Sequence, residues 1–178
     1  MPIFGDVSRF AVEFEIDRDY GGVWMFGRFF YWCGGQRVGN DESTSLRDVL
    51  IQLEQMEWAT GRRSSARFGE MPAHEMFRLI SGSRWGPGDN ISDLELELSM
   101  EEQWARHDIA PPVDVFDSWQ VLLVENEHSG RIVFGQEPHD ELTEVEVKHG
   151  EVDAVLAAVR KELLRIFERE ESKVEKPY

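Results

Sequence analysis

The sequence predicts an α+β domain with a predominantly antiparallel sheet of about six or seven strands, against which two main helices, residues 44–60 and 151–170, pack. Several short segments alternate apolar and polar residues, as strands with one buried face do, and turn residues separate them. The run 24–33 is apolar on both faces, which is typical of a central strand. The two helical segments instead repeat apolar residues every three or four positions.

The length of the chain fits one hydrophobic core. Because the chain has 178 residues, of which 41% are hydrophobic, we expect a single globular domain over residues 1–170. The final segment, 171–178, is highly charged, so we expect it to fray.

The first strands are expected before residue 39. Every second residue of 9–16 is apolar, a glycine-containing loop follows, and the run 24–33 then leads through a Gly-Gly turn into a short partner strand, 36–38. Arg28 is the polar exception in the central run. Either its stem packs on aromatic rings while its head finds a carboxylate or water, or it recognises a partner.

The first helix is predicted over residues 44–60, with Thr44 or Ser45 as the N-cap. Residues 61–70 are expected to form a polar loop with a small group of arginines. Three roles are open for these arginines: they are solvated, they contact an acidic partner, or they pair with acids of the same chain. A short helix is expected over 73–80, after a proline well placed for its first turn.

Most of the negative charge lies in residues 89–146. This stretch holds sixteen acidic side chains and two basic ones, so it carries −14 of the formal charge of −16. Within it, the leucines of 94–98 alternate with glutamates, which predicts a strand with one acidic face. The residues that follow, up to 110, fit either a helix or another strand.

The rest of the chain predicts a second hairpin, 120–125 with 131–135, and a half-exposed strand over 142–148. The helix expected over 151–170 carries one apolar stripe over about four turns. Packing across the sheet is the simplest use of this stripe, and dimerisation is the alternative, so we expect a monomer or a homodimer.

No catalytic or metal-binding motif occurs. The five histidines are scattered without HExxH, HxH or Cys/His spacing, and neither a phosphate loop nor a serine-nucleophile motif is present. Alternate acids such as Glu13 and Glu15 could bind a cation or raise one another's pKa, but such acids also keep the exposed face of a strand soluble. We therefore expect no catalytic residue, no metal and no cofactor, and the protein is not expected to be an enzyme.

Charge and cysteine content narrow the class of protein. The formal charge of −16 disfavours nucleic-acid binding, since neutralising phosphates requires a basic surface, and it favours a basic partner. Cys33 is the only cysteine, which excludes an internal disulfide and fits a reducing compartment. Neither a signal-peptide pattern nor a run of about 18 apolar residues is present, so we expect a cytoplasmic protein that does not insert into membranes.

The six tryptophans divide by their sequence context. Those in apolar patterns, expected in the core, are Trp24, Trp32 and Trp58. The other three lie among Gly, Glu, Asp and Ser and are expected to be partly exposed, and a tryptophan ringed by carboxylates is typical of a hot spot facing a basic protein. The predicted partner-binding residues are Trp85, Trp104, Asp108, Asp114, Asp117 and Trp119. The alternative is that these tryptophans cap the edges of the core.

The opening third of the chain resembles a known family. The runs GDVSRFAVEFEIDRDYGGVWMFGRFFYWCGGQRVGN and TSLRDVL are similar to the start of the Imm42 family of immunity proteins from bacterial polymorphic toxin systems, with a weaker echo at Val113 to Trp119. These motifs are fold signatures, so no family site residue can be carried over. The resemblance implies a protein that binds and neutralises a cognate toxin domain made by the same cell.

We therefore expect an immunity protein that docks the acidic surface of residues 89–146 on a cognate toxin domain with a basic surface, such as a nuclease. Two alternatives belong to other classes. One is a small acidic enzyme or metal-binding protein, and the other is an oligomeric adaptor or structural protein.

Overall fold

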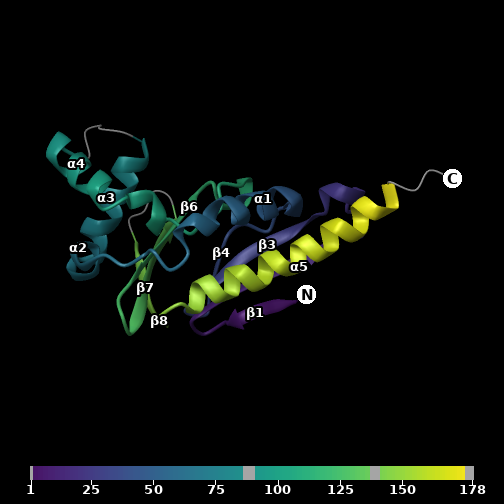
Figure 1. The fold of residues 1–178 in the computed structure, drawn as a ribbon, viewed down its shortest axis with the longest axis horizontal. Helices are drawn as coiled ribbons and strands as arrows, with labels where there is room; N and C mark the ends of the chain where they lie inside the picture. The colour runs from purple at the N-terminus through teal and green to yellow at the C-terminus, as the bar shows by residue number, and fades with distance from the viewer. Residues whose placement is uncertain (1, 86–90, 137–140, 175–178) are drawn as a thin grey trace. The chain divides into compact units, whose positions relative to one another are not determined.

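A computed structural model describes residues 2–85, 91–136 and 141–174 (Figure 1). The predicted α+β class with antiparallel pairing is confirmed, but the single sheet of six or seven strands is wrong, because the strands form one sheet of five and one of three. Each sheet belongs to its own compact unit. Unit 1 comprises Met1–Glu57, Pro111–Ser118 and Glu151–Tyr178, and unit 2 comprises Trp58–Ala110 and Trp119–Gly150.

The sheet of unit 1 has the strand order β1-β2-β3-β4, with β5 also paired to β3. Its strands are β1 (Ile3–Asp6), β2 (Phe10–Ile16), β3 (Phe26–Cys33), β4 (Gln36–Val38) and β5 (Thr44–Ser45). The register of the central pair sets Phe10 opposite Cys33 and Phe14 opposite Phe29. All four side chains are buried, so one face of this sheet forms the core of unit 1.

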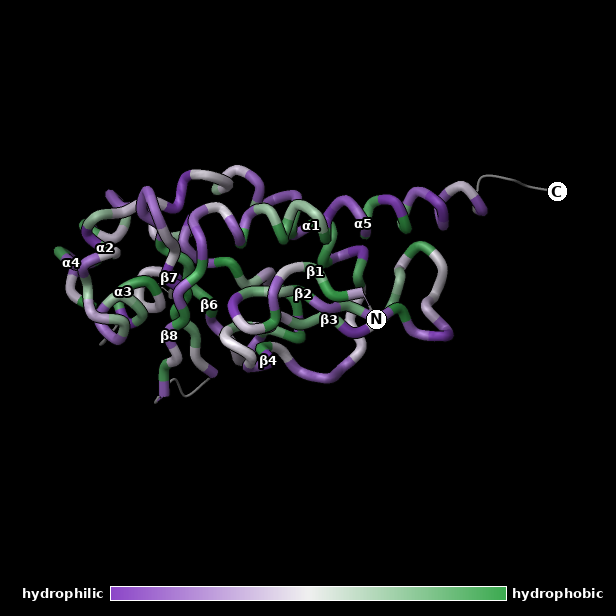
Figure 2. Tube along the Cα trace, turned by 90° about the horizontal axis from the view of Figure 1, so that it is seen from below, coloured by the Kyte–Doolittle hydropathy of each residue, from purple (hydrophilic) through white to green (hydrophobic). Residues whose placement is uncertain are grey.

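Two helices pack on that sheet, as predicted. They are α1 (Leu46–Met56) and α5 (Glu151–Val174), and Figure 2 shows both on the same side of its strands. Ser45 caps α1, because its hydroxyl accepts a hydrogen bond from the backbone N–H of Asp48 at 3.2 Å. The apolar stripe of α5 is largely buried inside unit 1, which favours packing over dimerisation as its use.

The opposite face of β3 differs from the prediction of an apolar strand face. The indole of Trp32 donates a hydrogen bond to Glu13 at 2.8 Å, and the guanidinium of Arg37 lies 5.0 Å from the centre of the Phe30 ring. Arg28 is paired with a carboxylate on the neighbouring strand, that of Glu15. The polar side chains on this face therefore form hydrogen bonds or ion pairs with one another or with aromatic side chains, or lie over aromatic rings.

The strand β3 also begins later than predicted. Gly22–Trp24 forms a 3-10 turn, η1, and Met25 has a left-handed backbone with φ 51°. A strand cannot continue through that conformation, so the first strand residue is Phe26 and not Trp24.

Unit 2 contains the second sheet, with the strand order β6 (Trp119–Glu125), β7 (Ser129–Gln136) and β8 (Thr143–Lys148). The predicted second hairpin and the last strand are confirmed. The helices of unit 2 are α2 (Ala66–Glu70), α3 (Ala73–Trp85) and α4 (Asp93–Glu101). With the sheet, they enclose a hydrophobic cluster of Phe68, Met76, Phe77, Leu79, Ile80, Ile91, Leu122, Val124 and Val133. Residues 61–70, which were expected to form a polar loop, thus include the short helix α2, whose N-terminus is capped.

The acidic strand predicted over 94–98 is wrong, because these residues belong to α4. Ser92 and Glu95 form a capping box, in which the side chain of each accepts a hydrogen bond from the backbone N–H of the other. Leu94 remains 65% exposed, whereas Leu96 packs against the hydrophobic cluster. Three acids of the charged stretch, Asp89, Glu137 and Asp140, lie outside the described residues.

Short 3-10 turns complete the described structure: η2 (Glu57–Ala59), η3 (Trp104–His107) and η4 (Asp114–Phe116). Within the described ranges, none of the helices combines the length and apolar character that crossing a membrane requires.

Candidate functional site

The predicted partner-binding residues are divided between the two units. Asp114 and Asp117 belong to unit 1. The four that belong to unit 2 are Trp85, Trp104, Asp108 and Trp119. The predicted set therefore falls into two groups, and contact of either group with a partner stays a prediction.

In unit 1, Asp114 is committed to its own fold. Its carboxylate accepts hydrogen bonds from the hydroxyl of Thr44 at 2.6 Å and from the backbone N–H of the next residue at 2.9 Å. The same turn carries Phe116 into the core, where its ring lies 4.8 Å from that of Tyr31. Asp117 is exposed, and nowhere in the described ranges does its side chain form a hydrogen bond or ion pair. Of this group, Asp117 is the residue open to a partner.

In unit 2, Asp108 is half-buried and paired. Its carboxylate accepts hydrogen bonds from Arg84 at 3.2 Å and from the backbone N–H of Ala110 at 3.1 Å. Burial raises the pKa of Asp108 to about 6, although the neighbouring guanidinium acts in the opposite direction. The carboxylate of Asp108 thus links α3 to the segment before β6 through these hydrogen bonds.

The tryptophans of unit 2 contact its hydrophobic core. Trp104 packs against the cluster, and its indole nitrogen lies 3.2 Å from the sulfur of Met100. The ring of Trp119 lies 6.5 Å from that of Phe134. Both are half-buried, which fits the alternative that they cap the edges of the core. Trp85 is the last residue of α3, and its side chain lies outside the described part of the structure.

Two of the tryptophans predicted to be in the core are the most exposed of those whose side chains the structure describes. Trp24 is 46% exposed and Trp58 is 47% exposed, whereas Trp32 is half-buried. That prediction was wrong for Trp24 and Trp58 because each lies on a 3-10 turn, where apolar neighbours in the sequence do not share its face.

Arginines from the first half of unit 2 pair with acids that follow them in the chain. The hydrogen bond from Arg78 holds the pKa of Glu95 down at about 2. Arg67 lies 3.9 Å from Glu102, which is also 3.8 Å from Arg106. At least part of the arginine group in residues 61–70 is therefore matched within the chain, which was one of the predicted alternatives.

The net negative charge is divided equally between the two units. Unit 1 holds 19 acidic and 11 basic side chains, and unit 2 holds 16 and eight, so each unit carries a net charge of −8. The stretch 89–146 is acidic in sequence, but arginines earlier in unit 2 offset part of its charge. In the described part of unit 2, the exposed acids without a hydrogen bond or ion pair include Glu97, Glu127 and Glu146.

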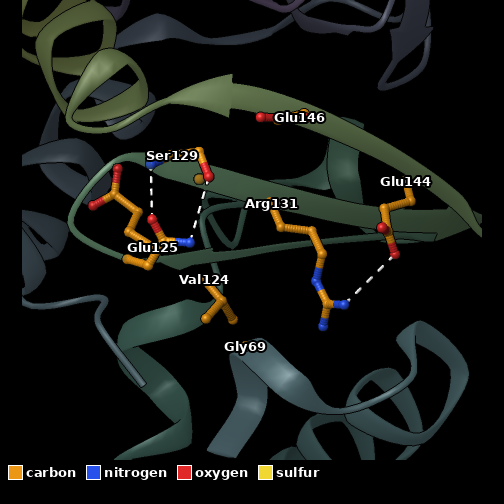
Figure 3. Close-up of a pocket in the computed structure, with 9 residues that line it drawn as sticks. Gly69, Val124, Glu125, Ser129, Arg131, Glu144 and Glu146 are labelled. Carbon is orange, nitrogen blue, oxygen red and sulfur yellow. Dashed lines mark hydrogen bonds and ion pairs between the residues drawn. The ribbon is translucent and has the colours of Figure 1, made fainter. Parts of the chain in front are cut away.

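A pocket of about 270 Å³ opens in unit 2, between α2 and the sheet (Figure 3). It is lined by Gly69, Val124, Glu125, Asn126, Ser129, Gly130, Arg131, Glu144 and Glu146. One nitrogen of Arg131 donates to the carbonyl oxygens of Phe68 and Met71, both at 2.8 Å, and another lies 3.8 Å from Glu144. Arg131 therefore links α2 to the sheet through these hydrogen bonds, and its side chain lines the pocket.

The carboxylates of the pocket differ in how they are used. Glu125 is only 3% exposed, and one of its oxygens accepts a hydrogen bond from the backbone N–H of Gly150 at 2.8 Å. Its other oxygen has no hydrogen-bond partner among the described residues. Glu144 and Glu146 are exposed on β8, so the rim of the pocket suits a cationic side chain. Nowhere in the described ranges do three His, Cys, Asp or Glu side chains gather to hold a metal ion.

Two surface features escaped the sequence reasoning. The pocket joins residues from α2 and three strands, and no local pattern in the sequence shows such a convergence. The exposure of Trp24 did have a signal, since Gly21 and Gly22 precede it and both adopt positive φ, which ends the strand pattern before the tryptophan.

Comparison with known proteins identifies the family. A family model described as Immunity protein 42 matches residues 1–162. The crystal structure of CdiI from Burkholderia dolosa AUO158 is similar in fold, with a TM-score of 0.69 and 17% sequence identity, over 90% of this chain and 99% of that one. A search of curated proteins finds no match. Since the family model covers most of the chain, the protein belongs to the immunity protein 42 family, Imm42, as its opening third indicated.

Proposed function

We propose that this protein binds a cognate toxin domain and neutralises it by direct contact, without catalysis of its own. Membership of an immunity protein family over residues 1–162 is the observation that carries the proposal. The similar solved structure is that of a CdiI protein, whose fold this chain shares.

The partner surface is expected to be basic. Each unit carries a net charge of −8, so an approaching cationic domain is attracted by either unit. Long-range attraction raises the association rate and orients the encounter, while short-range contacts decide the lifetime of the complex. A toxin domain that binds nucleic acid or nucleotides would carry such a surface, because its own substrate is anionic.

Two side chains that could support catalysis, those of His107 and Cys33, are buried in the fold and unsuited to react, which favours a binding role. The His107 ring is buried, and its Nδ1 donates to the carbonyl oxygen of Leu123 at 2.9 Å while Nε2 accepts from Arg106 at 3.2 Å. Burial raises the pKa of the Cys33 thiol to about 12, so the reactive thiolate is scarce. A free thiol also fits the cytoplasm, where we place the encounter with the toxin.

The test uses the cognate toxin domain, sought as the C-terminal domain of a large secreted protein encoded beside this gene, with its activity removed by substitution. We expect a stable complex, and an association rate that falls at least about tenfold between 50 and 500 mM salt, because screening weakens attraction between opposite charges. A complex whose association rate is independent of salt would show that docking is not electrostatic. Failure of the unsubstituted protein to bind this domain would contradict the proposal itself.

A further inference from the structure

We infer that the toxin domain docks on an exposed aromatic patch of unit 1, made of Trp24, Phe26, Arg47 and Ile51, by receiving Trp24 into an apolar recess on a basic surface. The inference rests on the proposed function and names the contact surface. It places the anchor of the complex outside the acidic stretch 89–146.

The members of the aromatic patch lie close together. Trp24 is 46% exposed and Phe26 is 40% exposed, and their rings stack with centroids 6.5 Å apart and planes 13° apart. The guanidinium of Arg47 lies over the Trp24 ring at 4.3 Å. Ile51, 38% exposed, follows Arg47 by four residues on α1 and so shares its helix face. Three of the seven large hydrophobic side chains exposed in the described ranges therefore lie on η1, β3 and α1, and α1 packs against the other two elements.

The backbone holds this patch rigidly. Met25, between the two aromatic residues, has a left-handed conformation (φ 51°, ψ 49°) that is uncommon for a residue with a side chain. Its side chain is fully buried, its N–H donates to the carbonyl oxygen of Gly22 at 3.0 Å, and its own carbonyl accepts from Leu46 at 3.2 Å. The turn is therefore tied to the first residue of α1, which carries the other half of the patch.

This rigidity favours binding over a purely structural role. Strained backbone persists where the surrounding structure fixes it, and such positions concentrate at functional sites. A tryptophan that is already held in place loses little conformational entropy when a partner covers it. Trp and Arg are also the residues most enriched among binding hot spots, which cluster in the centre of an interface.

The charges around the patch favour a basic partner. Asp17 lies directly beside it, because its backbone N–H donates to the carbonyl oxygen of Phe26 at 3.0 Å. The charged side chains near the patch in the chain are Asp17, Arg18, Asp19, Arg28, Asp48 and Glu54, and Arg28 is paired with Glu15 of β2. With Arg47 and Glu15 this makes five acids against three arginines, in a unit of net charge −8. An apolar centre with an acidic rim matches a basic surface that has an apolar recess.

Trp58 provides a matched control within the same chain. It is 47% exposed, and the guanidinium of Arg62 lies over its ring at 5.9 Å. In the described ranges no second aromatic ring stacks on it, and it belongs to unit 2. Removing Trp58 therefore removes as much exposed aromatic surface as removing Trp24, but not the patch.

The experiment measures the affinity of each variant for the inactive cognate toxin domain used to test the proposed function. We expect Trp24→Ala to bind at least about 30-fold more weakly and Trp58→Ala to stay within about twofold of the unsubstituted protein. Ile51→Lys and Ile51→Glu keep the helix propensity of α1, and we expect the lysine variant to bind about tenfold more weakly than the glutamate variant at low salt. Thermal unfolding of each variant confirms that it is folded.

The possible results separate the inference from the proposed function. Unchanged affinity of Trp24→Ala, or equal losses for the Trp24 and Trp58 variants, would overturn the aromatic patch as the docking surface. Equal affinities of the two Ile51 variants would overturn the basic character of the partner. Absence of binding by the unsubstituted protein would instead contradict the proposed function.

Discussion

His107 and Asp108 are neighbours whose pKa values burial shifts in opposite directions. Burial lowers the pKa of His107 from 6.5 to about 4, and the nearby Arg106 guanidinium acts in the same direction. Burial raises the pKa of Asp108 from 3.8 to about 6, against the opposing effect of Arg84. Between pH 4 and 6, the folded protein therefore holds both groups mainly in their neutral forms, while the unfolded chain charges both.

The two shifts give opposite pH dependences of stability. Unfolding lets His107 take up a proton in this range, so its contribution to the free energy of unfolding rises with pH, by about 1.4 kcal/mol per unit. Unfolding lets Asp108 release a proton, so its contribution falls with pH at the same rate. Over pH 4 to 6 the two contributions nearly cancel, and each alone would change stability by about 2 kcal/mol.

Single substitutions expose each contribution. Relative to the unsubstituted protein, Asp108→Asn is expected to gain stability as pH rises from 4 to 6, because the falling contribution is removed. His107→Gln is expected to lose stability over the same range. The assay is urea unfolding followed by tryptophan fluorescence at each half unit of pH. The protein is kept at low micromolar concentration, because its pI of about 4.7 lies in this pH range and a protein with little net charge tends to aggregate. If the stabilities of both variants ran parallel to that of the unsubstituted protein across this range, the two burial-driven pKa shifts would be wrong.

Three further predictions concern the fold. Ser92→Ala removes the capping box of α4 and is expected to lower the free energy of unfolding by about 1 kcal/mol, and an unchanged urea midpoint would argue against that cap. Cys33 is buried with its pKa raised to about 12, so a thiol reagent at pH 8 is expected to label it only after denaturation; rapid labelling of the folded protein would contradict its burial. Because the apolar stripe of α5 is largely buried inside unit 1, sedimentation at micromolar concentration is expected to give a monomer of 20.6 kDa, and a dimer would show that another surface self-associates.

The elements predicted well are those that local patterns determine. The apolar positions of α1 recur with helical spacing and follow a capping serine, so both its face and its start were readable from the sequence. The hairpin of β6 and β7 was readable because turn residues separate two apolar runs. Such signals depend on neighbours in the chain, and tertiary packing did not override them.

The features that were missed depend on contacts between distant segments or on competing local signals. Division of the strands into two sheets depends on which strands pair, and this does not follow from the pattern of any single strand. In α4, leucines at every second position fit a strand, but the Ser92–Glu95 capping box favours the helix and was present in the sequence. The acidic stretch was read without its arginine partners, which precede it in the chain.

The central claim is neutralisation of a toxin by contact, and titration of toxin activity tests it most directly. The active cognate toxin domain would be assayed on its substrate with increasing amounts of this protein. We predict that activity falls to zero at one equivalent, and that Trp24→Ala requires a large excess whereas Trp58→Ala does not. Full toxin activity in the presence of a tenfold excess of the unsubstituted protein would contradict the account.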